Sequence, residues 1–209
     1  RRFVVYLLSC NLAEVLVVGL AMISALPLPL LPLQILFLNL VTDVFPAFAL
    51  AMCEGEQDVL KRPPRDPRES ILAHAQWSVM FYSFVLTAAT FGALALARLW
   101  LGLDERAAVT VSFLTLAFAQ LWHAFNMRDP EASFFHNEVT RNPWVWAALA
   151  FCTALLLTAS YVPGLAHLLH LERPDIEMWA IVLGMSLVPP LVGAIASVRH
   201  ALIGRSSRI

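Results

Sequence analysis

Six long apolar runs constrain what this chain can fold into more than any other feature of its sequence. The first two lie between Phe3 and Cys53, a stretch of 51 residues that contains only two charged side chains, Glu14 and Asp43. Further runs recur at about 76–101, 108–127, 144–162 and 177–198. Because a helix needs roughly 20 apolar residues to cross the hydrocarbon core of a bilayer, this pattern predicts an all-α, polytopic bundle of six membrane-spanning helices.

The composition excludes several other classes of protein. Hydrophobic residues make up 59% of the chain, charged residues only 14%, and the mean hydropathy is +0.72. Soluble domains carry about 25% charged residues, so an ordinary soluble enzyme is excluded. A net charge of −1 offers no basic surface for nucleic acid. The three cysteines, Cys10, Cys53 and Cys152, form no CxxC pair, so we expect small core residues rather than a disulfide framework or a zinc site.

Proline and charge divide the chain into three predicted regions. Pro27, Pro29 and Pro32 interrupt the first long apolar stretch, which predicts a tight turn between helices at about 3–26 and 33–52. Residues 1–53 are therefore expected to form a helical hairpin. Residues 54–75 combine too many prolines for a helix with too many charges for lipid, so they are expected to form an aqueous loop. Residues 76–209 are expected to form a four-helix membrane region.

The distribution of Lys and Arg predicts the orientation of the bundle. An even number of spans places both termini on one side, and that side holds eleven of the 14 basic residues: Arg1, Arg2, Lys61, Arg62, Arg65, Arg68, Arg128, Arg141, Arg199, Arg205 and Arg208. The opposite side holds Arg98, Arg106 and Arg173. Since basic loops stay in the cytoplasm, both termini and the 54–75 loop are predicted to be cytoplasmic.

Two carboxylates inside predicted spans are the first candidates for chemistry. Each costs about 2.5 to 3.5 kcal/mol at the bilayer centre, and no basic residue lies at a comparable depth to neutralise Glu14 or Asp43. Asn11 precedes Glu14 by three residues, on the same face of its helix. Protonation or a bound cation is then the means of neutralising them.

The second helix adds oxygen ligands at helical spacing. Asn39, Thr42 and Asp43 share one face, and Pro46 cannot donate to the carbonyl of Thr42 four residues earlier. Together with Asn11 and Glu14 these residues offer oxygen ligands of the kind that Ca²⁺ prefers. The alternative is that the amides and hydroxyl only join packed helices through hydrogen bonds. Two unpaired acids on facing stripes favour cation binding.

Three motifs then resemble a known family in order and spacing. The segments SCNLAE at 9–14, LFLNLVTDVFPA at 36–47 and DVLKRPPRDP at 58–67 are similar to the fifth helix, the sixth helix and the following cytoplasmic loop of P-type ATPases, particularly the calcium-transporting subgroup typified by the sarcoplasmic reticulum pump. The last four runs fit helices seven to ten of that family. The resemblance implies that Asn11, Glu14, Asn39, Thr42 and Asp43 are transport-site ligands.

Departures from the family pattern qualify what the resemblance implies. Two-calcium members carry an acidic ligand in the eighth helix, where the best ungapped match here places Ala117, so one ion per cycle is expected. Gln120, His123 and Asn126 share a helical face and are interpreted as helix-packing residues, with a place in the ion pathway as the alternative. Oxygen ligands alone do not separate Ca²⁺ from Mn²⁺, Na⁺ or K⁺, or from H⁺.

The catalytic machinery of such pumps does not occur in this sequence. It contains no Asp-Lys-Thr-Gly phosphorylation motif, no phosphate-binding glycine loop and no fourth-helix proline-glutamate motif. The chain is therefore expected to be the C-terminal membrane part of an ATP-driven cation pump in a plasma or bacterial inner membrane. Its expected partners are the lipid bilayer, the first four helices and the cytoplasmic domains, with Mg-ATP bound only by the full-length pump and proton countertransport through Glu14. The alternatives are a stand-alone channel or secondary carrier, and an inert scaffold for a partner subunit.

Overall fold

The fold of the chain is all-helical over the residues that a computed structural model describes, which are 2–24, 28–52, 75–128 and 137–206. The first half contains α1 (Arg2–Ser24), α2 (Pro32–Leu38), the π-helical turn η1 (Asn39–Asp43), α3 (Val44–Ala51), α4 (Gln76–Ala95) and the π-helical turn η3 (Leu96–Trp100). The second half contains α5 (Glu105–His123), the 3-10 turn η4 (Ala124–Met127), α6 (Pro143–Tyr161), α7 (Pro163–Leu168), α8 (Ile176–Ser186) and α9 (Val188–Ser206).

The prediction of six spans is confirmed. Six helical segments of the described chain are long and apolar enough to cross a membrane: Arg2–Ile23, Pro32–Ala51, Gln76–Trp100, Glu105–Met127, Pro143–Tyr161 and Ile176–Ser197. The chain is thus an integral, multi-pass membrane protein. Each predicted boundary lies within a few residues of the observed one.

Three of these helices begin directly after a short polar side chain that caps their first turn. Asp104 caps α5 by accepting a hydrogen bond from the Ala107 amide at 2.8 Å. Asp175 caps α8 in the same way. Asn142 caps α6, and Pro143 follows at the first helical position, where its missing N–H costs nothing. The caps supply acceptors for amides that have no partner in the first turn.

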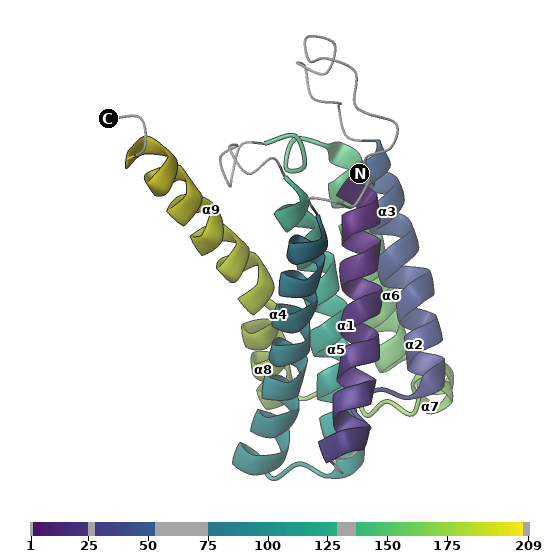
Figure 1. Cartoon of the computed structure of the whole chain (residues 1–209). Coiled ribbons are helices and arrows are strands. Elements are labelled where there is room, and N and C mark those ends of the chain that lie inside the picture. Colours follow the sequence, from purple (N-terminus) through teal and green to yellow (C-terminus); the bar gives the residue numbers. More distant parts are fainter. Residues whose placement is uncertain (1, 25–27, 53–74, 129–136, 207–209) are drawn as a thin grey trace.

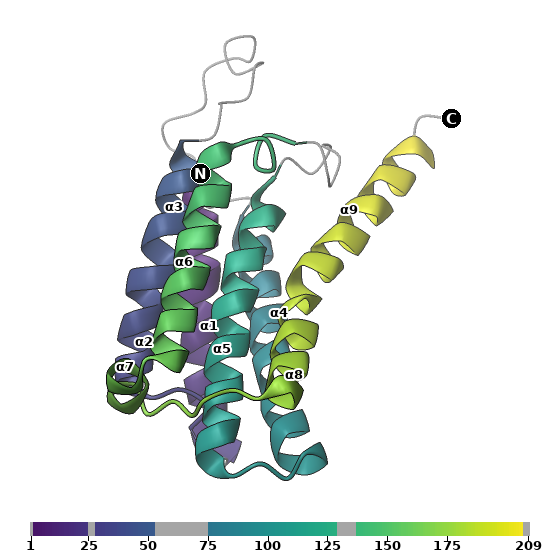
Figure 2. The ribbon, with the colours of Figure 1, turned by 180° about the vertical axis from the view of Figure 1, so that it is seen from behind.

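Helix α5 is the centre of the bundle. Every residue from Ala107 to Leu121 is buried, whereas the other spans leave an apolar face exposed to lipid or to further protein. In the view of Figure 1, α1 and α4 lie in front of α5. In the reverse view α6 and α8 flank it (Figure 2). Polar residues of α5 are consequently enclosed by the other helices.

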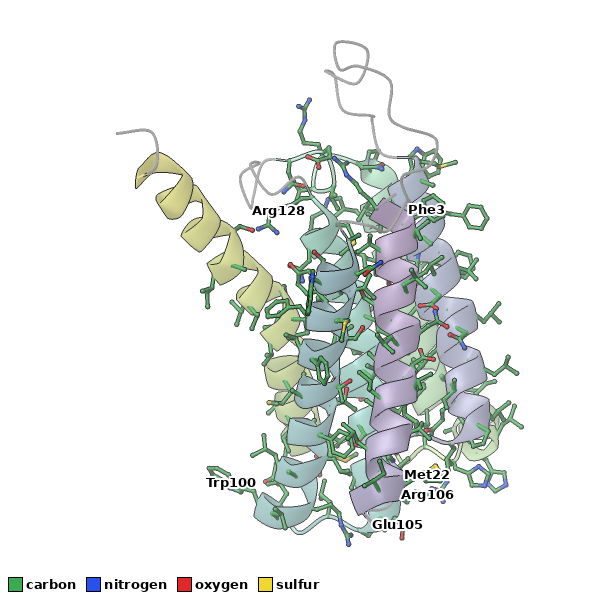
Figure 3. The ribbon with its side chains drawn as sticks, in the orientation of Figure 1. Phe3, Met22, Trp100, Glu105, Arg106 and Arg128 are labelled. Carbon is green, nitrogen blue, oxygen red and sulfur yellow. The ribbon has the colours of Figure 1, made fainter. Side chains whose placement is uncertain are left out.

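Three charged residues, Arg128, Glu105 and Arg106, mark the two ends of the bundle. Arg128 is at the end where α1 begins and α9 ends, and Glu105 and Arg106 are at the opposite end (Figures 1 and 3). We call the first of these the amino-terminal end. This arrangement agrees with two termini on one side of the membrane, while the assignment of that side to the cytoplasm stays a prediction from charge.

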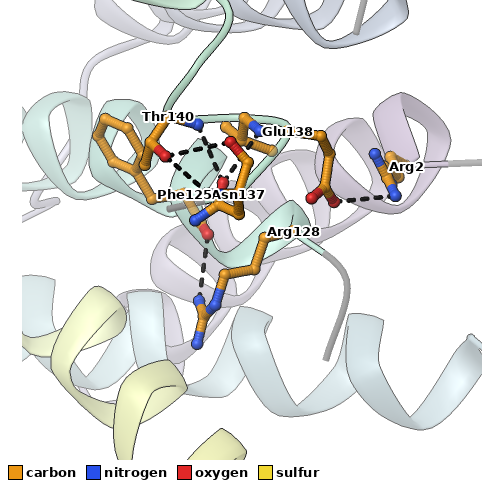
Figure 4. A network of polar contacts seen from close by, with 7 residues as sticks. Arg2, Phe125, Arg128, Asn137, Glu138 and Thr140 are labelled. Carbon is orange, nitrogen blue, oxygen red and sulfur yellow. Dashed lines mark hydrogen bonds and ion pairs between the residues drawn. The ribbon is translucent and has the colours of Figure 1, made fainter. Parts of the chain in front are cut away.

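A short loop at the amino-terminal end joins several helices (Figure 4). The side chain of Asn137 accepts hydrogen bonds from the amides of Val139 and Thr140, both at 2.9 Å, and so closes a tight turn. Glu138 forms an ion pair of 2.9 Å with Arg2 at the beginning of α1. Asn142 donates to the carbonyl of Ala49 near the end of α3 at 3.1 Å. This loop, residues 137–142, therefore contacts both helices of the predicted hairpin.

The last span is broken between α8 and α9. Its two halves meet at Leu187, and Pro189 and Pro190 follow in the first turn of α9, where proline is tolerated. Asn126 donates to the carbonyl of Pro189 at 3.0 Å. A β-carbon at Gly193 would collide with the side chain of Asn126, so only glycine lets α9 approach this closely.

We expect Gly193→Ala to destabilise the protein by about 1–3 kcal/mol, the usual cost of overpacking a closely packed contact. The readout is the thermal unfolding midpoint of the purified protein in lipid-containing detergent. Gly184→Ala in α8 is the matched control, because a β-carbon there meets nothing within 4 Å. Equal midpoints for the two variants would contradict the close approach.

Several predictions concern residues outside the described part of the chain. These are Pro27, Cys53 and nearly all of the 54–75 loop, including its DVLKRPPRDP motif. Within the described residues, Cys10 and Cys152 are both buried and unpaired with one another, as expected of core residues.

Candidate functional site

The site begins with the turn η1, which interrupts the second span at Asn39–Asp43. A π-helical turn widens the backbone spiral, and such turns often occur at functional positions. It separates α2 from α3 within one continuous membrane crossing. Thr42 and Asp43 are buried within this turn, and Asn39, at its beginning, is half-buried.

Pro46 shapes the hydrogen bonding of this turn as the sequence predicts. It has no N–H to offer to the carbonyl of Thr42, which instead accepts a hydrogen bond of 2.7 Å from the hydroxyl of Tyr6 in α1. Tyr6 is completely buried. The freed carbonyl is therefore occupied by a side chain that sequence reasoning did not select.

The first span contributes an amide and a carboxylate. The Nδ2 atom of Asn11 donates to Asp43 Oδ2 at 2.8 Å, so the two helices of the predicted hairpin meet at these side chains. Glu14, one turn further along α1, is only 4% exposed, and Asp43 is 5% exposed. Both carboxylates thus lie inside the bundle rather than in lipid.

Gln120 of α5 joins the two helices from a third direction. Its Nε2 donates to Glu14 Oε1 at 3.0 Å, and its Oε1 accepts from the hydroxyl of Thr42 at 2.7 Å. We interpreted Gln120 as a helix-packing residue, and that interpretation misses its contact with the carboxylate. The position assigned from the family pattern, Ala117, lies one turn earlier and carries no polar group. An amide inside a predicted membrane-spanning run was the signal that could have found it.

The other two residues of that helical face have structural contacts. Asn126, in the turn η4 that follows α5, donates to the carbonyl of Pro189 in α9, and its amide also lies 3.2 Å from His123 Nδ1. His123 is completely buried and packs against the rings of Tyr6 and Tyr82, with centroid distances of 5.9 and 4.6 Å. For Asn126 the geometry agrees with the expected packing role.

The electrostatic balance of the site is negative. No Arg or Lys of the described residues pairs with Glu14 or Asp43. Asp43 Oδ1 and Asn39 Oδ1 are buried acceptor atoms with no hydrogen-bond partner among the described residues. An unpaired acceptor in a low-dielectric interior is costly, so each of these oxygens favours a further partner.

Most of the polar side-chain atoms of this site are oxygens. The described residues contain no group of three or more His, Cys, Asp and Glu side chains that could hold a metal ion. Two carboxylates, amide oxygens and a hydroxyl remain, contributed by Asn11, Glu14, Asn39, Thr42, Asp43 and Gln120. Calcium takes six to eight such oxygens in a flexible geometry.

A six-span helical membrane protein with an oxygen-lined, negatively charged site between its helices is the general class that this structure defines. A family model described as "Cation transporting ATPase, C-terminus" matches residues 27–198. The chain therefore belongs to the cation-transporting ATPase family, in its C-terminal membrane region.

Curated relatives support the same family. The chain is 40% identical over 190 residues to a calcium-transporting ATPase of Bacillus subtilis (strain 168), covering 90% of this chain and 21% of that protein. It is 30% identical over 210 residues to calcium-transporting ATPase 1 of Bacillus cereus, covering 93% of this chain and 24% of that protein. Calcium-transporting ATPase 1 of Lactococcus lactis is 27% identical over 191 residues. The chain spans about a fifth to a quarter of the length of these relatives.

Proposed function

We propose that this chain is the C-terminal membrane part of a P-type ATPase that exports Ca²⁺. The observation that carries the proposal is the pair of buried carboxylates, Glu14 and Asp43, which have no basic partner among the described residues. A divalent cation between them would neutralise the site. The names of the relatives support Ca²⁺ as that cation.

The proposed ligands are Asn11, Glu14, Asn39, Thr42 and Asp43, with Gln120 beside them. Asp43 is the central one, because it already contacts Asn11 of the first span through Oδ2, while its Oδ1 has no hydrogen-bond partner among the described residues. The amide groups of Asn11 and Gln120 donate to the carboxylates. On binding, the cation competes with these donors for the same oxygens.

The charge that this chain offers supports one ion per cycle. Two carboxylates balance one divalent cation, and the α5 positions Ala117 and Gln120 add no further negative charge. The remainder of the pump would supply the Mg-ATP site and the phosphorylated aspartate. Tilting of α1 during phosphorylation would separate Asn11 and Glu14 from Asp43 and so release the ion.

Proton countertransport is a second part of the proposal. A carboxylate that has lost its cation in a low-dielectric surrounding is stabilised by taking up a proton. Glu14 is suited to this role because it is buried and its described hydrogen-bond partner, Gln120, is neutral.

The test is stimulation of ATP hydrolysis in the full-length protein by one metal at a time. We expect micromolar Ca²⁺ to activate hydrolysis and uptake into inside-out vesicles, with Mn²⁺ as the closest competitor and Na⁺ and K⁺ inactive. Cation flux without ATP would instead support a channel or a secondary carrier. Hydrolysis and flux that respond to none of these ions would contradict the proposal.

A further inference from the structure

We propose that Cys152 of α6, together with Tyr6 of α1, is a positioning residue for the cation site, because these two side chains hold the backbone of the turn η1 from opposite helices. The inference rests on the proposed function, since its consequence is the affinity of that site for the cation. Neither residue is proposed to touch the ion.

The turn η1 needs donors from outside because of Pro46. This residue follows Thr42 by four positions and Val41 by five. An α-helical pattern would pair the carbonyl of Thr42 with the nitrogen of Pro46, and a π-helical pattern would pair the carbonyl of Val41 with the same nitrogen. Proline has no hydrogen on that nitrogen. Two consecutive carbonyls at the centre of the site thus face a position that cannot donate.

Two completely buried side chains supply these donors. The hydroxyl of Tyr6 donates to the carbonyl of Thr42 at 2.7 Å, and the thiol of Cys152 donates to the carbonyl of Val41 at 3.0 Å. One comes from the first span and the other from the fifth. They therefore hold neighbouring peptide groups of the same turn between two helices.

This attachment determines where the ligands point. Thr42 and Asp43 belong to the turn whose carbonyls are held, and their side chains face Gln120 and Asn11. A buried carbonyl that loses its donor is costly in free energy. The turn therefore becomes more stable when it moves so that the carbonyl reaches another donor. Such a movement reorients Asp43 while leaving its charge intact. The expected defect is weaker cation binding rather than slower turnover.

The experiment compares Cys152 variants in the full-length pump. Cys152→Ala removes the donor, and Cys152→Ser keeps a donor of similar size. Ser160→Ala removes a buried hydroxyl of the same helix whose hydrogen bond, among the described residues, is to Leu156 of α6 itself. The readout is the Ca²⁺ concentration for half-maximal ATPase activation, beside the maximal rate at saturating Ca²⁺. We expect Cys152→Ala to raise that concentration about three- to tenfold with little change in maximal rate, from the usual net value of one hydrogen bond. Cys152→Ser and Ser160→Ala are expected to match the parent.

Tyr6→Phe provides an independent variant in case Cys152→Ala does not fold. It removes one hydroxyl and keeps the ring that packs on His123. The same rise in half-activating Ca²⁺ supports the proposal. Unchanged half-activation in Cys152→Ala, or in Tyr6→Phe when only that variant folds, overturns it while leaving the proposed function standing. A parent pump without any Ca²⁺ dependence overturns both.

Discussion

Replacing Asp43 with Asn in the full-length pump is expected to abolish cation-dependent phosphorylation by ATP. Asparagine has nearly the same size and still offers an oxygen to Asn11, so the contact of 2.8 Å between the hairpin helices can persist. What disappears is one of the two negative charges of the site. Since ligand charge tunes calcium affinity over several orders of magnitude, we expect the Ca²⁺ affinity of the variant to fall about 100-fold or more. The Ca²⁺ concentrations that activate the parent would then no longer support phosphorylation. The measurement is phosphoenzyme formation from radiolabelled ATP across a series of Ca²⁺ concentrations.

A matched variant separates charge from location. Asp104→Asn also removes one carboxylate, at the beginning of α5, where Asn caps a helix as well as Asp does. We expect it to phosphorylate like the parent. If Asp43→Asn retains the Ca²⁺ dependence of the parent, Asp43 is not a ligand.

Glu14→Gln is the variant with the second largest expected effect. Gln120 donates to the Glu14 carboxylate at 3.0 Å, and a neutral side chain in place of Glu14 can still accept that bond. The loss of charge should raise the half-activating Ca²⁺ concentration by about 10- to 100-fold. Asp43 still provides the central carboxylate, so the effect is smaller than in Asp43→Asn. ATP-driven uptake of radiolabelled calcium into inside-out vesicles gives the measurement.

The control for Glu14 is Glu177→Gln. Glu177 is an exposed carboxylate in the first turn of α8, away from the site. Calcium uptake should be unchanged in this variant. Equal uptake curves for Glu14→Gln and the parent would remove Glu14 from the ligand set.

The spans could be predicted because lipid imposes a simple rule on sequence. Each run of about 20 apolar residues had to become a helix, and the prolines near residue 30 had to end one helix and begin the next. The break at Leu187 was not predicted, although Pro189 and Pro190 stood in the sequence. The predicted span was long enough to cross the membrane with or without a kink, so length alone did not locate it.

The site could be predicted only where its residues lie close together along one helix. Asn11 with Glu14, and Thr42 with Asp43, follow helical spacing, and Pro46 indicated a freed carbonyl. Tyr6, Gln120 and Cys152 reach the same turn from three separate helices, and their roles depend on which helices become neighbours. Spacing within one helix carries no information on that choice. The resemblance to a family directed attention to Ala117, whereas the geometry directs it to Gln120.

The loop of residues 137–142 gives the two ends of the hairpin unequal attachments. Its bond to the Ala49 carbonyl is buried, while its ion pair with Arg2 is partly exposed, with side chains 24% and 19% accessible. Exposed ion pairs contribute only about 0.2–1 kcal/mol. Of these two contacts, the one to the beginning of α1 is the weaker and the one to the end of α3 is the stronger. A displacement of the beginning of α1 relative to this loop thus breaks a weaker contact than the same displacement of α3.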